Sequence, residues 1–368
     1  MAQDIYRINK SKAVQKTFAD DYVEELSFGS HSVANGTTGG TFIRKETSIA
    51  IFAKGKRDYD GHVFLIFRGT DKLLDWITDF NIGTRTTHAG LAAHAGFVRA
   101  FADLEQAITN FMPEIAKAKS VHIIGHSLGG ALASLAVERI ADGRPRKKSI
   151  FLYTFGAPRV GTLEFAKHLE GLLGAENIYR VYHNCDPVPM IPTWPFFHCA
   201  LSDRGYHLLH PARVHAGAGY VKSMNESNSW PLLHAYSHMK YTERSIQHFL
   251  LSDKPVTLTN ATIFLFSEAL SWVIASVAKG MALTLGGGLA TMWSVFDRLA
   301  YLLKSEAELD EHQDSWAMRL LKKLCTVLGL RHSKNADFSH SFIRTILTTF
   351  YHRTIDIVRS AMRRVDSV

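Results

Sequence analysis

Residues 125–130 read Gly125-His126-Ser127-Leu128-Gly129-Gly130, between the apolar run VHII at 121–124 and the small-residue run ALASLA at 131–136. A β-type run, then Gly-x-Ser-x-Gly, then a helix of small residues is the pattern of a nucleophile elbow. The serine of such an elbow lies on a sharp, strained turn, and larger side chains at the two glycines would collide with the adjacent strand and helix. The sequence therefore predicts Ser127 as a nucleophile at the end of a buried strand.

Strand-like and helix-like segments alternate on both sides of this motif. We expect strands over 48–54, 61–67, 119–124, 149–155 and 177–183. We expect helices near 13–26, 72–80, 95–117, 128–141, 161–173 and 236–251, and a loop over the Gly-, Ser- and Thr-rich residues 29–40. This alternation indicates an α/β fold with a mostly parallel central sheet and helices on both faces.

Two further residues follow Ser127 in the order nucleophile, acid, histidine that an α/β-hydrolase requires. Asp186 comes just after a predicted strand and before Pro187, where a rigid turn can hold its carboxylate against an imidazole, although a plain turn aspartate has the same surroundings. His238 opens a helix-like stretch and is predicted as the general base. Because the region is rich in histidines, His198 remains the alternative base.

Short blocks occur in a fixed order between about residues 45 and 250, and each is a weak signal alone. They are Phe67-Arg68-Gly69-Thr70 with Asp75, Trp76 and Asp79; His94-Ala95-Gly96-Phe97; the elbow; TFGAPRVG at 154–161; Asp186-Pro187-Val188-Pro189; and His238 with Tyr241. As a set they resemble the class 3, or fungal-type, lipase family of the α/β-hydrolases. The resemblance implies an α/β-hydrolase domain over residues 1–252.

The resemblance also implies a role for each site residue. Ser127 would attack an ester carbonyl, with His238 as general base and then acid, and with Asp186 orienting the imidazole. The backbone N–H of Leu128 and the N–H and hydroxyl of Thr70 would hold the oxyanion, although Thr70 can also serve as a helix N-cap. The implied activity is that of a serine-dependent lipid ester hydrolase, a lipase or phospholipase A, which works through an acyl-enzyme.

Residues 253–368 have no counterpart in that pattern and predict an α-helical C-terminal region. Residues 261–296 are strongly apolar, but the longest charge-free run, 280–296, is shorter than the ~20 residues that span a bilayer. We consider a buried hairpin, a lid or a membrane-docking module. Helices are expected near 296–309, 313–329 and 340–364. The last of these is rich in arginine and either docks on an anionic membrane or packs its apolar stripe on the core.

Composition sets broader limits. The chain of 368 residues is 46% hydrophobic with a net charge of +8, which is typical of a globular protein. It has no Gly-x-Gly-x-x-Gly or Walker loop and no Cys-x-x-Cys pair, so we expect no nucleotide cofactor and no metal. No nucleic-acid-binding motif accompanies the positive charge. The cysteines at 185, 199 and 325 are expected to be buried thiols rather than a disulfide framework.

The expected partners are a lipid substrate, an anionic membrane surface and a protein inhibitor. The first ten residues lack the apolar core of a secretory signal, so we expect a cytoplasmic protein or one exported without a Sec signal. The positive charge favours phospholipid as substrate. Two alternative functions are a soluble carboxylesterase that acts on short or aromatic acyl esters, and a membrane-binding or permeabilising protein with a degenerate hydrolase domain.

Overall fold

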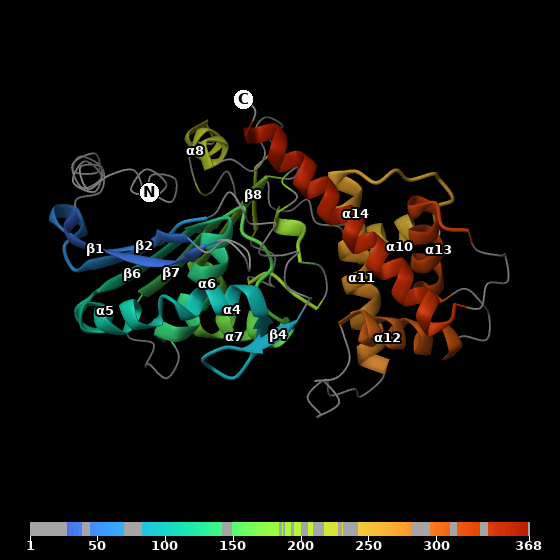
Figure 1. Ribbon diagram of the computed structural model, residues 1–368, viewed down its shortest axis with the longest axis horizontal. Helices are drawn as coiled ribbons and strands as arrows, with labels where there is room; N and C mark the ends of the chain where they lie inside the picture. The colour runs from blue at the N-terminus through green and yellow to red at the C-terminus, as the bar shows by residue number, and fades with distance from the viewer. Residues whose placement is uncertain are drawn as a thin grey trace. The chain divides into compact units, whose positions relative to one another are not determined.

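The computed structural model describes residues 28–38, 45–69, 83–141, 149–183, 186, 188–192, 195–199, 205–208, 217–226, 230, 242–280, 295–309, 315–331 and 338–366. The chain divides into two compact units (Figure 1). One comprises Met1–Pro192 with Phe196–His238, and the other comprises Thr193–Pro195 with Met239–Val368.

Within the described residues, a seven-stranded sheet organises the first unit in the order β1-β2-β3-β6-β7-β8-β9. The strands are β1 (Phe28–Thr38), β2 (Lys45–Gly55), β3 (His62–Phe67), β6 (Ser120–His126), β7 (Ser149–Phe155), β8 (Ile178–His183) and β9 (Gly205–Leu208). β1, β2 and β3 pair antiparallel, and each pair from β3 to β9 is parallel. The predicted mostly parallel α/β sheet is confirmed.

Helices connect the parallel strands. α4 (Ala95–Ala102) and α5 (Glu105–Lys117) lie between β3 and β6, α6 (Leu128–Ala141) follows β6, and α7 (Leu163–Leu173) follows β7. α6 packs on β3, β6 and β7 and also contacts α4 and α7 (Figure 1). Its small residues, mostly alanine and glycine in the first two turns, allow this close packing, and nearly all of the helix is buried.

Different helices pack on the two faces of the sheet. Because side chains alternate along a strand, β6 directs Gly125 towards the first turn of α6 and His126 towards the opposite face. On that opposite face the His126 ring contacts Tyr220 of α8 (Gly217–Glu226), and Tyr220 packs on Val181 of β8. Described helices therefore lie on both faces of the sheet, with α8 near the carboxyl ends of the parallel strands.

The sequence missed several elements, and one expectation was wrong. Of residues 29–40, predicted as a loop, residues 29–38 belong to β1, an antiparallel edge strand with two register irregularities. The single helix expected over 95–117 is interrupted at Asp103 and Leu104. β4 (Thr84–Thr86), β5 (Ala92–His94), β9 and α8 were not predicted. The helices expected over 13–26 and 72–80 lie outside the described residues.

The second unit is helical, as predicted. It contains α10 (Glu243–Leu251), α11 (Asn260–Gly280), α12 (Val295–Leu309), α13 (Trp316–Leu328) and α14 (His340–Asp366). Phe266 of α11 lies at its centre, with edge-to-face ring contacts to Phe249 of α10 at 5.1 Å and to Phe350 of α14 at 5.7 Å. α10, expected at the end of the catalytic region, is thus part of the helical unit.

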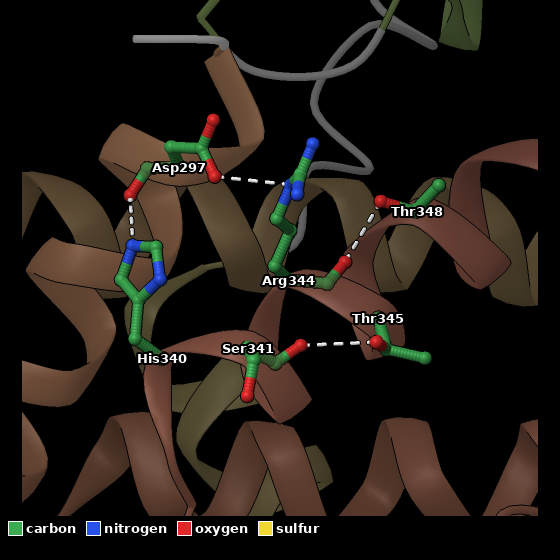
Figure 2. Close-up of polar contacts among 6 residues, drawn as sticks. All are labelled: Asp297, His340, Ser341, Arg344, Thr345 and Thr348. Carbon is green, nitrogen blue, oxygen red and sulfur yellow. Dashed lines mark hydrogen bonds and ion pairs between the residues drawn. The ribbon is translucent and has the colours of Figure 1, made fainter.

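α14 buries its apolar side chains in this helical unit. Its buried residues include Ile343, Ile346, Leu347, Phe350, Tyr351, Ile355 and Val358. Polar contacts fix its first turns to α12: the His340 ring N–H donates to the Asp297 carbonyl at 3.0 Å, and Arg344 pairs with the Asp297 carboxylate at 3.0 Å (Figure 2). The apolar stripe therefore packs on a core, while Arg344, His352 and Arg353 are exposed.

The apolar segment at 261–296 is described over its first part as α11. Ile263, Phe266, Leu270 and Val273 of this helix are buried. Among the described helices, none combines the length and apolar character needed to cross a bilayer. Residues 281–294 lie outside the described part of the chain.

Candidate active site

Ser127 occupies a strained turn between β6 and α6. Its φ of +56° lies in the left-handed region that non-glycine residues rarely adopt. Hydrogen bonds on both sides hold the turn: the Ser127 N–H donates to the Phe155 carbonyl at 2.9 Å, and the Gly130 N–H donates to the Ser127 carbonyl at 2.8 Å. This is the geometry of the nucleophile elbow that the sequence predicted.

The glycines around Ser127 are required by close backbone approach. A Cβ at Gly125 would lie 2.1 Å from the Gly129 carbonyl oxygen, and one at Gly129 would lie 2.2 Å from the Phe67 carbonyl oxygen. A Cβ at Gly130 would lie 2.4 Å from the Ala157 Cβ. The end of β3 is thus pressed against the first turn of α6, so the chain that leads to Thr70 starts beside the elbow.

Asp186 is fully buried just beyond β8. The Val188 N–H donates to its Oδ1 at 2.9 Å, and its own N–H donates to the His183 carbonyl at 3.0 Å. β6 and β8 are both parallel to β7, so Ser127 and Asp186 both lie beyond the carboxyl ends of these strands. The structure therefore brings these two predicted residues to one end of the sheet.

Tyr220 of α8 holds the same carboxylate, and the sequence analysis did not single it out. Its hydroxyl donates to Asp186 Oδ2 at 2.6 Å and accepts from the His183 N–H at 3.1 Å. Burial, and then the Asp186 carboxylate, raise the pKa of Tyr220 well above its usual value, so it remains a donor. No local motif marks this tyrosine, since its role depends on packing between α8 and β8.

Leu128 is buried and is the first residue of α6, so its backbone N–H belongs to the positively polarised end of the helix. His238 and Thr70, the predicted base and second oxyanion donor, lie outside the described residues. Their placement relative to Ser127 and Asp186 remains a prediction.

His198, the alternative base, contacts the segment that follows the acid. Its Nε2–H donates to the Pro189 carbonyl at 2.7 Å. Burial, followed by the charges of Arg180 and Arg159, lowers the pKa of His198 well below its usual value. A neutral ring that is hydrogen-bonded to the backbone anchors the turn beyond Asp186.

Cys199 and Cys325 are buried free thiols, and burial raises the pKa of Cys199 to about 12 and that of Cys325 to about 11. Cys185 lies outside the described residues. Among the residues that the structure describes, no group of three His, Cys, Asp or Glu side chains could hold a metal ion.

Comparison with known proteins finds a family match over part of the chain. Residues 64–196 match the family model described as lipase (class 3). This segment belongs to the class 3 lipase family. The class 3 lipase segment runs from β3 to Phe196 and so contains Ser127 and Asp186, whereas His238 and the helical unit lie beyond it.

The relatives of this class 3 lipase segment match only part of the chain. The chain is 40% identical over 134 residues to secreted mono- and diacylglycerol lipase 1 of Fusarium solani, covering 34% of this chain and 38% of that protein. It is 32% identical over 170 residues to a lipase of Rhizopus niveus (43% and 42%) and 26% identical over 234 residues to phospholipase A1-II 1 of Oryza sativa subsp. indica (56% and 56%). The chain spans less than half the length of the first two relatives.

Among solved structures, the native Rhizomucor miehei lipase propeptide complex is 24% identical, with a TM-score of 0.41, and covers 56% of this chain and 64% of that one.

Proposed function

We propose that this chain is a serine-dependent ester hydrolase of acyl lipids, of the lipase or phospholipase A type. The observation that carries the proposal is the strained elbow of Ser127 at the same sheet edge as the buried, hydrogen-bonded carboxylate of Asp186. Family membership supports it, because the relatives are named lipases and phospholipases.

In the proposed reaction, the Ser127 Oγ attacks the acyl carbonyl while the His238 imidazole takes the hydroxyl proton. Asp186 accepts the other imidazole N–H and stabilises the imidazolium. The tetrahedral intermediate then collapses, the bond to the lipid alcohol breaks, and the imidazolium protonates the leaving oxygen. Water, deprotonated by the same imidazole, then attacks the acyl-enzyme. The bond to Ser127 Oγ breaks, the imidazolium returns the proton to that oxygen, and the fatty acid leaves.

The negative oxygen of the tetrahedral intermediate needs converging donors. We assign the Leu128 N–H, at the start of α6, and Thr70, on the chain that leaves β3. The contact between Gly129 and the Phe67 carbonyl supports this pairing, because it brings the ends of β3 and β6 together. Loss of one such donor typically costs about 2.7–4 kcal/mol of transition-state stabilisation.

The proposed substrate is an acyl lipid in a membrane or aggregate, with phospholipid preferred. The net charge of +8 favours an anionic lipid surface, and Arg353 and His352 are exposed on α14. Because the apolar stripe of α14 is buried, we propose peripheral, electrostatic contact rather than insertion of that helix. Such contact should weaken as salt increases. A protein inhibitor remains a proposed partner.

Fatty acid release from vesicles of phosphatidylethanolamine and phosphatidylglycerol tests the function, with Ser127→Ala as the matched control. Release by the wild type alone, with a preference for long over short acyl chains, supports the proposal. Cleavage restricted to soluble short esters would make the protein a carboxylesterase. Vesicle leakage without release by either protein would show a membrane-permeabilising activity instead.

A further inference from the structure

The carboxylate of the proposed triad is held from two directions by residues outside the segment that carries it. We propose that Tyr220 and Gly156 act together as a seat that orients Asp186 towards the base, an inference that rests on the proposed function. Tyr220 supplies the hydrogen bond, and Gly156 supplies the space in which it forms.

Packing against neighbouring rings holds the Tyr220 side chain in place. Only 2% of the residue is exposed. Its ring lies 4.5 Å from the His183 ring of β8, 5.7 Å from the His126 ring of β6 and 6.4 Å from the Phe155 ring of β7. The tyrosine therefore contacts the ends of three neighbouring strands, one of them directly before Ser127, and its position is coupled to the elbow.

The hydroxyl of Tyr220 joins the end of β8 to the acid. It accepts from the His183 N–H at 3.1 Å and donates to Asp186 Oδ2 at 2.6 Å, the length expected of a charge-assisted O–H···O⁻ bond. The Val188 N–H donates to the other oxygen at 2.9 Å. With one fixed donor on each oxygen, rotation of the carboxylate about its terminal bond is restrained.

Gly156 makes room for this hydrogen bond. It has a φ of +57°, and its N–H donates to the Val181 carbonyl at 2.9 Å. A Cβ at this position would lie 2.7 Å from Asp186 Oδ2 and 2.8 Å from the Tyr220 hydroxyl oxygen. Any other residue would therefore displace the carboxylate or the phenol.

The seat has a chemical consequence beyond geometry. A carboxylate has about four acceptor positions, so an imidazole N–H can add to the two donors described. The Tyr220 hydrogen bond draws charge from the carboxylate and so weakens its stabilisation of an imidazolium. Removing the hydroxyl should leave the carboxylate free to rotate, which slows the reaction. It should also raise the pKa of the base, an effect that a purely structural role would not produce.

The experiment measures kcat and KM against pH on a soluble monomeric p-nitrophenyl ester, with active sites titrated by a fluorophosphonate. Tyr220→Phe should lower kcat per titrated site about tenfold, leave KM unchanged and move the acidic limb of kcat/KM to higher pH. Replacement of Tyr220 by 3-fluorotyrosine, a stronger donor, should move that limb to lower pH. Tyr59→Phe, the same deletion on a tyrosine that packs against His62 and Phe64, should change nothing.

Opposite shifts of the limb in the two Tyr220 variants support the seat. An unchanged limb and kcat in both, or a loss of titrated sites alone, would overturn it while leaving the proposed function intact. An inactive wild type, or a Ser127→Ala variant as active as the wild type, would overturn the proposed function and the role of Tyr220 with it.

Discussion

At the scale of single residues, glycine-to-alanine substitutions test whether the elbow glycines are required because a side chain would clash. Gly125→Ala places its Cβ 2.1 Å from the Gly129 carbonyl oxygen. Overpacking of a buried site typically costs about 1–3 kcal/mol, so we expect a loss of that order together with loss of hydrolysis. Gly171→Ala is the matched control, because no atom outside its chain neighbours and its own helix backbone lies within 4 Å of a Cβ at this position. In α7 it should be stabilising by about 0.5–1 kcal/mol. Urea unfolding measures both, and equal losses would contradict the steric argument.

His94 makes the stability of the first unit depend on pH. Burial, with a smaller contribution from Arg99, lowers the pKa of His94 from 6.5 to about 4. A group whose pKa is lower in the folded state takes up its proton first in the unfolded state, so stability present above pH 6.5 is lost as the pH falls towards 4. The linkage amounts to about 3 kcal/mol over this range.

His94→Asn removes this titration while retaining an N-cap residue for α4, where the His94 ring accepts from the Gly96 N–H at 3.2 Å. Unfolding free energies measured from pH 7 to 4 should therefore vary less steeply in His94→Asn than in the wild type. His88→Asn, at an exposed turn, should keep the wild-type slope. Equal slopes in all three proteins would show that His94 is not the group responsible.

Residue by residue, the local geometry around Ser127 and Asp186 was predictable where spacing along the chain determines it. The elbow could be predicted because Gly125, Ser127 and Gly129 lie within one turn. The position of Asp186 could be predicted because it follows a strand and precedes a proline. Tyr220 could not be predicted, because it lies 34 residues beyond Asp186 and contacts it only through tertiary packing. Gly156 lies inside a recognised block, but its contact with the acid depends on the same packing.

At the scale of elements, the interior parallel strands were predicted well and the edge strands were not. β3, β6, β7 and β8 consist mostly of apolar or aromatic residues, and their bounds agree with prediction within about two residues. β1 reads as a loop because its polar and glycine residues lack that pattern, yet backbone pairing with β2 makes it a strand. Interior strands are therefore decided by side-chain burial, and edge strands by their neighbour.

A lysine fixes α10 within the helical unit. Lys323 of α13 donates to the Ser252 carbonyl, the C-cap of α10, at 2.5 Å and lies 5.0 Å from the Phe249 ring centroid. Lys323→Met removes both interactions and should lower stability of the unit by about 1–2 kcal/mol. Hydrogen exchange of the α10 amides should accelerate accordingly. Lys322→Met, one position earlier on α13, is the control, and similar exchange in both variants would refute the assignment.

At the scale of the whole molecule, the boundary between the two units decides how the chain can be shortened. The sequence predicted a division after residue 252, which leaves α10 with the hydrolase region. In the structure Ile246 and Leu250 of α10 are buried and Phe249 packs on Phe266 of α11, all within the helical unit. An isolated helix of this length is marginal in water. A chain that ends at 252 would therefore expose an unsupported apolar segment.

We expect a protein of residues 1–252 to bind the dye ANS and to self-associate more than one of residues 1–241. Light scattering after size-exclusion chromatography compares the two chains, and hydrogen exchange over 243–251 is measured in the 1–252 chain. A monomeric 1–252 chain with protected α10 amides would show that this helix is stable without α11 and α13.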